Sequence, residues 1–491
     1  MFAALRQPGG RAALFVAIVS ALVFSAAPAS QAQSAEPSPT PFQYVGSVAL
    51  TPSAGVAGTE ITLAGSGFAP GAALDVDWTT VTGQWVLEGD ANEEFHGRTF
   101  DPVSIPVADA IAADDGTFEA TFVAPVDHGF NHDVTVSTGG QLLNKAGFRL
   151  EPSVTISPES GPLGTPITIR MEGIGYANLE NSWQVTYDNQ FVGVLTSVTS
   201  GGIGEAVIPA TGAEGKHHIR VVHGAFTVPY LNTQQSPRPD RSVYDLDFEI
   251  TVGDAILPAS AEIQGLPIEA ASEPAGDGPA IWADVASGMV GTPVTVYGRG
   301  LPAGADLGLA WSTVVGNRVG GQGWDEAVAE VARVTVADNG TFELPWVIPD
   351  DLGGPHRLVA MDADAPVAET SLTITPSIIS ATTAQGPYGS TIEIHLKGVG
   401  WTETANIYNV TYDNAYLGYS CGFNSQGDVT ITLPAVGSPG WHFIDLYPGI
   451  YKGEDAPGVQ NFRIPQLTFA ADHPGERLPA FHVAYKVTAE G

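Results

Sequence analysis

The sequence predicts an all-β chain that is built from tandem copies of two related units, and three observations support this. Gly (58 residues) and Pro (37) are frequent, and Val, Ile and Thr recur in short runs between them. Such a composition is typical of short strands joined by tight turns. A chain of 491 residues is also too long for one hydrophobic core and indicates several domains. Finally, the chain repeats itself, and the repeats set the order of its units.

The N-terminal segment, residues 1–32, has the features of an export signal. Arg6 and Arg11 precede an apolar run over residues 12–27, and small residues follow at the positions that a signal peptidase needs. The Ser- and Pro-rich stretch 33–45 is expected to be a disordered linker. We therefore predict a secreted protein that is extracellular or associated with the cell surface and does not span a membrane once the signal is cleaved.

The chain is strongly acidic, with a formal net charge of −34. Nucleic acid and anionic membranes are poor partners for such a protein, because like charges repel. The acidic residues are spread along the chain and no D-x-D-x-D-G loop is present, so solubility is the simpler explanation of the charge. Cation binding remains the alternative.

The single cysteine, Cys421, allows no disulfide within the chain. Its counterpart in the other copy of the repeat is Thr196, so we expect a small buried residue at this position. Pairing between two chains remains open.

Two units alternate along the sequence. The letters VTYDN stand at residues 185–189 and again at 410–414, and they mark two copies of a unit that we call B. A second unit, A, precedes each copy and carries W-x-T-V-x-G at residues 78–83 and 311–316, with a longer loop in its first copy. The predicted boundaries are A1 (46–150), B1 (151–253), a linker rich in Ala, Pro and Glu (254–280), A2 (281–373) and B2 (374–491).

The repeated motifs are interpreted as structural. Each unit has a strand that ends in G-x-G, and no helix follows as a phosphate-binding loop would need, so the glycines are expected to form turns. VTYDN is expected to be a hairpin with a two-residue Asp-Asn turn. This register would place Val185 opposite Val192 and Trp183 opposite Val194. The alternative, a catalytic Tyr-Asp pair, lacks an accompanying base or metal constellation.

Four histidines occupy equivalent places near the end of the four units. They lie in separate domains and cannot converge on one metal ion, so a structural role at a strand entrance is favoured. These residues are His132, His217, His356 and His442.

The turn and strand patterns resemble a known family. SPESGPLGTPITI…GIG (157–175), the related stretch 50–71 and the Asp-Asp-Gly-Thr-Phe and Asp-Asn-Gly-Thr-Phe turns (114–118 and 338–342) are similar to the IPT/TIG-type and related immunoglobulin-like repeats of secreted prokaryotic surface proteins. The resemblance covers about residues 46–491. It implies a tandem array of four immunoglobulin-like β-sandwich domains in A-B-A-B order. The family has no fixed catalytic set, so no catalytic residue is implied.

Two functions remain after these steps. The first is a non-enzymatic extracellular interaction or structural protein, whose partner would be a protein or glycan outside the cell or in its envelope. The second is a glycan- or small-ligand-binding module that uses the insertion at residues 84–100, because aromatic rings stack on sugars and clustered carboxylates can hold Ca²⁺. An ordinary hairpin with a solvated acidic loop is the simpler interpretation of this insertion. The candidate ligand-binding residues are Trp85, Glu88, Asp90, Glu93, Glu94 and Phe95.

An enzyme is not predicted, since H-E-x-x-H and C-x-x-C are both absent. No cofactor is predicted, and Ca²⁺ at the acidic insertion is the alternative. The linker 254–280 is expected to be exposed and to act as a hinge between the A1-B1 and A2-B2 pairs. It contains no Lys or Arg, so a glutamate-specific protease, not trypsin, should cut it.

Overall fold

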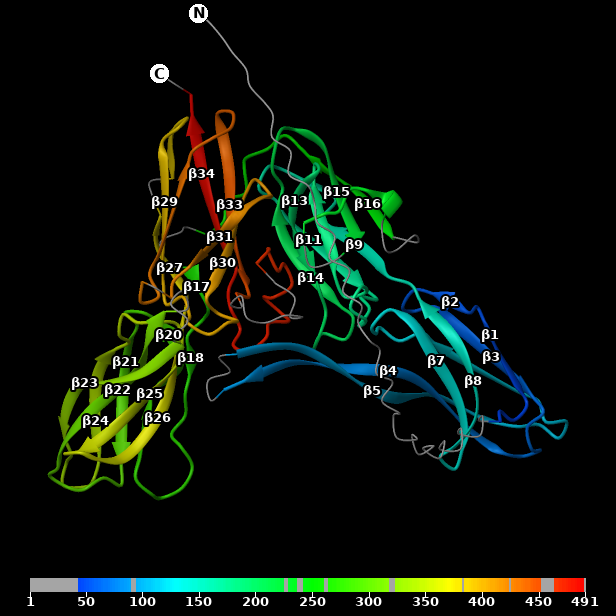
Figure 1. Cartoon of the computed structure of the whole chain (residues 1–491), viewed down its shortest axis with the longest axis horizontal. Helices are drawn as coiled ribbons and strands as arrows, with labels where there is room; N and C mark the ends of the chain where they lie inside the picture. Colours follow the sequence, from blue (N-terminus) through cyan, green and yellow to red (C-terminus); the bar gives the residue numbers. More distant parts are fainter. Residues whose placement is uncertain are drawn as a thin grey trace, which may run out of the picture. The chain divides into compact units, whose positions relative to one another are not determined.

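The structure, a computed structural model, is all-β (Figure 1). It describes residues 43–89, 94–224, 228–235, 242–259, 264–317, 323–381, 384–423, 425–451 and 463–489. These residues form strands β1 to β34 and one 3₁₀ turn, η1 (Thr233–Gln235). The predicted signal 1–32 and most of the stretch 33–45 lie outside the described residues. In the described part of the chain, no helix has the length and apolar character needed to cross a membrane.

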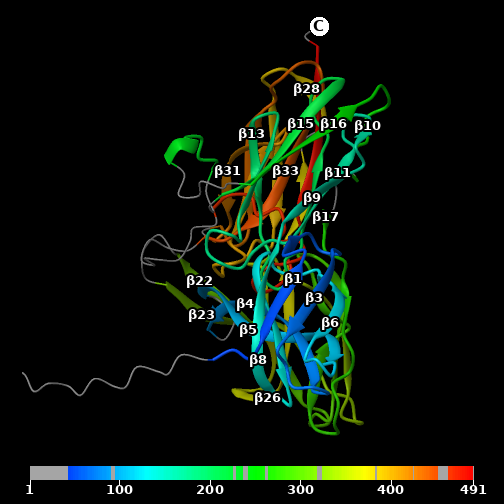
Figure 2. The same ribbon diagram turned by 90° about the vertical axis from the view of Figure 1, so that its right-hand side faces the viewer.

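The A1 residues form a three-stranded and a five-stranded sheet. In β6, Phe118, Ala120 and Phe122 alternate with exposed residues and point into a hydrophobic core, as a half-buried strand requires. Figure 2 shows the smaller sheet. In sheet order, the strands are β1 (Ser47–Thr51), β3 (Glu60–Ser66) and β6 (Phe118–Val123), and then β2 (Ala54–Gly55), β8 (Gln141–Leu150), β7 (Phe130–Thr138), β4 (Ala73–Glu88) and β5 (Glu94–Ile111).

The B1 residues repeat this arrangement around a core that includes Trp183 and Phe248. The strands, in sheet order, are β14 (Gly204–Pro209), β11 (Pro166–Glu172) and β9 (Ser153–Ser157), and then β10 (Ser160–Gly161), β16 (Val243–Ile250), β15 (Gly215–His223), β12 (Trp183–Tyr187) and β13 (Gln190–Leu195).

The A2 residues enclose a core around Trp311 and Leu309. Their smaller sheet contains β19 (Ala280–Ala283), β21 (Pro293–Arg299) and β24 (Phe342–Val347). The larger one contains β18 (Glu269–Ala270), β20 (Val285–Met289), β26 (Ala365–Thr375), β25 (Gly354–Asp362), β22 (Asp306–Asn317) and β23 (Gly323–Thr335).

The B2 residues enclose a core around Tyr408 and Phe481. One sheet contains β17 (Gln264–Gly265), β27 (Ser377–Ala381), β29 (Thr391–Lys397) and β32 (Val429–Pro434). The other contains β28 (Gln385–Pro387), β34 (Phe481–Thr488), β33 (Gly440–Gly449), β30 (Ile407–Tyr412) and β31 (Ala415–Cys421).

Each of these sheet pairs has one short strand that runs parallel to the last strand of its larger sheet. The pairs are β2 with β8, β10 with β16, β20 with β26 and β28 with β34. All other ladders are antiparallel in the described residues. Two sheets packed on a shared apolar core make β-sandwiches of the general immunoglobulin-like type.

The VTYDN motif forms the expected hairpin, but its register differs from the prediction. Asp188 and Asn189 both have positive φ, 49° and 67°, as a two-residue hairpin turn of this kind requires. A β-bulge between Val185 and Thr186 then shifts the ladder, so that Val185 pairs with Gly193 instead of Val192. The second copy has the same bulge and pairs Val410 with Gly418. A count of residues from the turn cannot reveal a bulge, and the predicted partners were therefore wrong.

The described parts of the segment 254–280, residues 254–259 and 264–280, are mostly exposed but make hydrogen bonds to the neighbouring units. Its Ile256 amide donates to the Leu163 carbonyl of B1 at 2.8 Å. Its strand β17 pairs with β27 of B2, and its strand β18 pairs with β20 of A2. The Gln264 amide group also donates to the His482 carbonyl at 2.7 Å. The described parts of the segment, 254–259 and 264–280, are thus held by hydrogen bonds to B1, A2 and B2, whereas the composition of the segment had indicated an open hinge.

Candidate functional site

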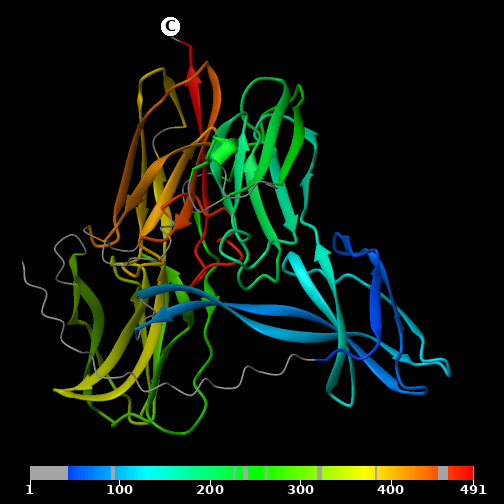
Figure 3. The same cartoon turned by 45° about the vertical axis from the view of Figure 1, so that its right-hand side comes forward.

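The A1 insertion extends two strands instead of forming a long loop. Strands β4 and β5 have 16 and 18 residues, whereas their counterparts β22 and β23 have 12 and 13. Figure 3 shows the resulting hairpin, which we call the A1 arm (residues 79–89 and 94–104). Gly83 marks a close approach, because a Cβ atom there would lie 2.0 Å from the carbonyl oxygen of Val198 in B1. The arm therefore passes directly against B1.

The tip of the A1 arm packs on B2. Phe95 is fully buried and forms a small hydrophobic cluster with Ile450 and Phe469 of B2. The Trp85 ring contacts the rings of Phe95 and Phe469 at centroid distances of 6.0 and 5.8 Å. The Phe95 amide donates to the Glu403 carboxylate at 2.7 Å. The aromatic residues of the insertion thus serve an intramolecular interface.

A buried carboxylate, Asp472 of B2, joins this interface to B1. Its Oδ1 accepts from Trp85 Nε1 at 3.1 Å and from the amide and hydroxyl of Thr199 at 3.0 and 2.6 Å. Its Oδ2 accepts from the Val198 amide at 2.5 Å and from the Ser200 hydroxyl at 3.2 Å. Asp472 is 2% exposed. A buried carboxylate with this many donors is well satisfied, and it ties three parts of the sequence together.

The charge of Asp472 also acts on a nearby arginine of the arm. Burial lowers the pKa of Arg98 to about 10, and the negative charge of Asp472 opposes this shift. The Arg98 guanidinium donates to the Asn181 side-chain oxygen of B1 at 2.6 Å. The arm interface therefore combines the polar contacts of Arg98 with the apolar cluster around Phe95.

The chain leading to Asp472 also covers the edge strand of B1. The Val194 amide donates to the Pro465 carbonyl at 2.9 Å, and the Leu467 amide donates to the Val194 carbonyl at 3.0 Å. The Thr196 amide donates to the Thr468 hydroxyl at 3.2 Å. Thr196 is fully buried as a result. An exposed edge would otherwise be free to pair with other chains.

Cys421 does not share the burial of its counterpart Thr196. It is exposed at the end of β31, which contradicts the expectation of a small buried residue. The reason is the segment 465–472, which covers β13 of B1, the strand equivalent to β31. The two copies have equivalent strands, and among the described residues this backbone-bonded cover lies on β13.

The residues predicted to bind a ligand are separated by the arm interface. Phe95 is buried and Trp85 is half-buried, whereas Glu88 and Glu94 are exposed. Asp90 and Glu93 lie outside the described residues. The buried face of the tip is occupied by B2, so Phe95 offers no open ring for a sugar.

Glu88 and Glu94 meet a residue that the sequence reasoning missed, His96. The His96 Nε2 lies 3.1 Å from a Glu88 oxygen and 3.3 Å from a Glu94 oxygen. One ligand atom from each of the three lies within 4.8 Å of the others, and all three residues are exposed. Ca²⁺ prefers oxygen ligands only, whereas an imidazole with carboxylates suits zinc or another transition metal. An i, i+2 pattern on β5, Glu94 and His96, was the available signal.

The histidines of the A units are held by packing. His132 stacks on Trp78 with a centroid distance of 4.4 Å, and His356 stacks on Trp311 at 4.6 Å. Each imidazole has a carbonyl oxygen at both ring nitrogens, at 2.6 to 2.9 Å. The same Trp side chains donate to Asp127 and Asp351 at 2.8 and 2.9 Å.

The histidines of the B units explain the repeated Tyr and Asp of VTYDN. His442 Nδ1 contacts the Asp413 carboxylate at 2.5 Å, and the ring stacks on Tyr412. His217 makes the same contacts with Asp188, at 2.6 Å, and with Tyr187. The hydrogen bond from Asp413 raises the pKa of His442. These contacts agree with the predicted structural role at the entrance of β15 and β33.

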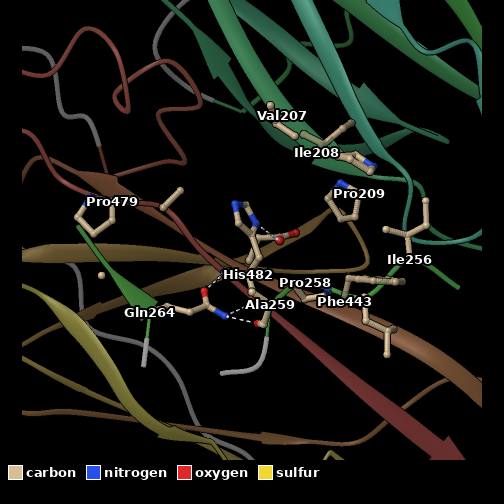
Figure 4. A pocket seen from close by; sticks show the side chains of 16 residues that line it. Val207, Ile208, Pro209, Ile256, Pro258, Ala259, Gln264, Phe443, Pro479 and His482 are labelled. Carbon is tan, nitrogen blue, oxygen red and sulfur yellow. Dashed lines mark hydrogen bonds and ion pairs between the residues drawn. The ribbon is translucent and has the colours of Figure 1, made fainter. Parts of the chain in front are cut away.

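A separate cavity of about 510 Å³ lies where B1, B2 and the linker meet. Figure 4 shows Val207, Ile208 and Pro209 of B1 on one side and Gln264 and His482 on the other. Apolar residues of the linker and B2 complete most of its wall. They are Ile256, Leu257, Pro258, Ala259, Phe443, Pro479 and Ala480.

The cavity contains one acid and one base, Asp445 and His482. They face each other across the β33–β34 ladder, and the His482 Nδ1 lies 2.6 Å from Asp445 Oδ1. Burial by itself lowers the pKa of His482, but the hydrogen bond and charge of Asp445 outweigh it and raise the pKa above its ordinary value. Asp445 is 1% exposed, and its Oδ2 has no hydrogen-bond partner among the described residues. Leaving a buried acceptor unsatisfied costs about 1–3 kcal/mol.

The other copy of the repeat has a different pair at the same place. In B1, Arg220 and Asp245 are register partners on β15 and β16 and form an exposed ion pair at 2.6 Å. In B2 the acid, Asp445, lies on β33, whereas the B1 acid lies on β16. The B2 pair lines the cavity. The change from Arg220 in B1 to Asp445 at the equivalent position of B2 was the available sequence signal for this site.

Comparisons with known proteins identify no family. No protein-family model and no curated protein matches the chain. Among solved structures, the ICAM-5 ectodomain fragment is 12% identical, with 90% of this chain and 99% of that chain covered, at a TM-score of 0.19. Invasin, described as a bacterial integrin-binding protein, is 10% identical over 90% of this chain and 79% of that chain, at 0.18.

Salmonella alpha-2-macroglobulin reacted with methylamine is 11% identical, with 91% of this chain covered, at a TM-score of 0.19. The chain spans 31% of the length of that protein. No IPT/TIG family is identified by these comparisons.

Proposed function

We propose that the chain is a non-enzymatic extracellular interaction or structural protein built from tandem immunoglobulin-like domains of the IPT/TIG type. The observation that supports this most is the buried Asp472 network, which fastens the A1 arm, B1 and B2 to one another. The repeated histidines and their Asp partners are likewise used for packing. The Asp472 network and the repeated histidines thus stabilise contacts between and within the β-sandwiches, as a rigid binding or envelope protein requires.

The test is saturable binding of the labelled full chain to the envelope fraction of its source cells. Unlabelled protein should compete for the binding. An Asp472→Asn variant should bind more weakly, because its A1 arm is released from B1 and B2. A second experiment treats the envelope fraction with protease or with glycosidases before binding. Loss of binding after one treatment distinguishes a protein partner from a glycan. Non-saturable retention that unlabelled protein does not displace would refute the proposal.

The alternative function is a glycan- or small-ligand-binding module at the A1 insertion. The exposed trio Glu88, Glu94 and His96 favours a cation at this place. The burial of Phe95 counts against a sugar platform that needs its ring. A glycan-array signal or a melting shift that depends on Ca²⁺ would support this alternative, and the absence of both would leave the first function.

A further inference from the structure

The cavity between B1, B2 and the linker presents one polar side chain to a ligand, the imidazole of His482. Of the described residues that line the cavity, only Asp445, Gln264 and His482 have polar side chains. Asp445 is 1% exposed and therefore out of a ligand's reach, and the Gln264 side chain is already bonded to backbone groups of Ala259 and His482. By contrast, 37% of the His482 side chain is exposed, and its ring projects into the cavity (Figure 4).

Asp445 determines which nitrogen of this ring faces a ligand. The His482 Nδ1 lies 2.6 Å from Asp445 Oδ1, and a carboxylate only accepts, so Nδ1 carries a proton. The other nitrogen, Nε2, has no hydrogen-bond partner in the described part of the chain. Burial lowers the pKa of His482, but the hydrogen bond and charge of Asp445 outweigh it and raise the pKa. The ring therefore stays a cation to higher pH than an ordinary histidine, and Nε2 is then an N–H donor.

The rest of the wall determines the shape and polarity of the ligand. Apart from the three polar side chains, the described lining residues are Gly, Ala, Pro, Val, Ile, Leu and Phe. Ile256 and Leu257 at the linker side are each 43% exposed and would be covered by an apolar body. The volume of about 510 Å³ is within the usual range for small-molecule sites. A fitting ligand is thus apolar, with one hydrogen-bond acceptor at the end that meets Nε2.

The charges around His482 favour an ionised acceptor over a neutral one. A hydrogen bond between two ionised groups is about twice as strong as one between neutral groups. The residues of B1 and the linker that line the cavity in the described chain are uncharged, and β33 contributes Asp445 and the Tyr447 ring, 6.4 Å from the imidazole. Burial raises the pKa of Tyr447, so it stays neutral. The net charge of −34 acts from further away, and salt screens it beyond about 8 Å.

We infer that this cavity binds a small apolar molecule that carries a carboxylate. The His482 Nε2–H donates to the carboxylate, and Asp445 holds the imidazole in place from its other side. The apolar body lies against Val207, Ile256 and Phe443. The inference goes beyond the proposed function, because a structural or interaction protein can carry such a site with or without an envelope partner.

The experiment titrates the full chain by calorimetry with three probes that share an indole ring. These are indole-3-acetate, which carries a carboxylate, indole-3-acetamide, a neutral molecule of nearly the same shape, and tryptamine, which carries an ammonium group. At about pH 6, where an ordinary histidine is already largely protonated, indole-3-acetate should bind about tenfold more tightly than indole-3-acetamide, and tryptamine should give no signal. The affinity for indole-3-acetate should then fall as the pH rises through the pKa of His482, because the imidazolium loses its charge and the Nε2 proton.

Three variants keep the result interpretable. His482→Gln removes the cation, so it should bind indole-3-acetate about tenfold more weakly or worse and lose the pH dependence. His218→Gln removes an exposed histidine of B1 that contacts Asp245 and Asp247, and it should leave binding unchanged. Val207→Trp fills the cavity from β14 while His482 stays intact, and it should abolish binding even if His482→Gln fails to fold.

Four results would overturn the inference. They are a wild-type protein that does not bind indole-3-acetate, equally tight binding of indole-3-acetamide or tryptamine, an affinity for indole-3-acetate that does not fall with rising pH, and wild-type affinity in Val207→Trp or in folded His482→Gln.

Discussion

Asp472 offers the sharpest test of the interface between the A1 arm, B1 and B2. Substitution by Asn keeps an oxygen for the three donors at Oδ1 but places an NH₂ group against the Val198 amide. This amide is buried and donates to Oδ2 at 2.5 Å. The loss of one charge-assisted hydrogen bond costs about 1.5–3 kcal/mol. Asp472→Ala removes all the contacts and should cost about 3–5 kcal/mol, the range for breaking a buried charged cluster.

Hydrogen exchange measured by mass spectrometry on the peptide that contains Val198 and Thr199 reports this loss directly. Protection of the Val198 amide should fall about ten- to a hundredfold in Asp472→Asn and about a hundredfold or more in Asp472→Ala. Asp133→Asn, which removes an exposed partner of Lys145, is the matched control and should leave this peptide unchanged. Equal protection at Val198 in wild type and Asp472→Ala would mean that the network does not hold the interface, and the reasoning would fail.

Three other predictions concern the histidines, the acidic residues of the A1 insertion and the linker. His442→Gln should lower the melting temperature modestly. Because Asp413 raises the folded-state pKa of His442, the deficit should be largest below about pH 6.5 and shrink as the pH rises through the folded pKa, and a deficit that grows with pH would contradict this. A calorimetric Ca²⁺ signal, if present, should vanish in the Glu93→Gln, Glu94→Gln double variant; a flat wild-type titration ends the calcium hypothesis. A glutamate-specific protease that cuts within 254–280 should leave two fragments that co-elute in gel filtration, since B1 and B2 contact each other, and their separation would refute that contact.

The sequence predicted the local features well because each depends on neighbouring residues. Positive φ at Asp188 and Asn189 follows from the turn chemistry of a short polar pair. The β-bulge at Val185 was missed because a bulge leaves no mark in the alternation of so short a strand.

The candidate sites were predicted only in part, because their burial depends on distant parts of the chain. Trp85 and Phe95 were correctly placed on one hairpin, yet the same aromatic pattern serves equally for an open sugar platform and for packing against Phe469. His96 was overlooked, although it shares a strand with Glu94. The sequence gives no sign that Asp445 is buried. Its burial depends on B1 and the linker, which line the same cavity.

By itself, the sequence determined the all-β class, the two repeated hairpins and the packing role of the four histidines, since turns, periodicity and internal copies are written in contiguous residues. The tertiary structure alone decided which copy of each element is covered. Thr196 is buried and its counterpart Cys421 is exposed, and the Asp445 pair faces a cavity whereas the Arg220 pair faces solvent. The physical reason is that such contacts join surfaces hundreds of residues apart. Their stability comes from shape and from paired buried groups, which no local pattern encodes.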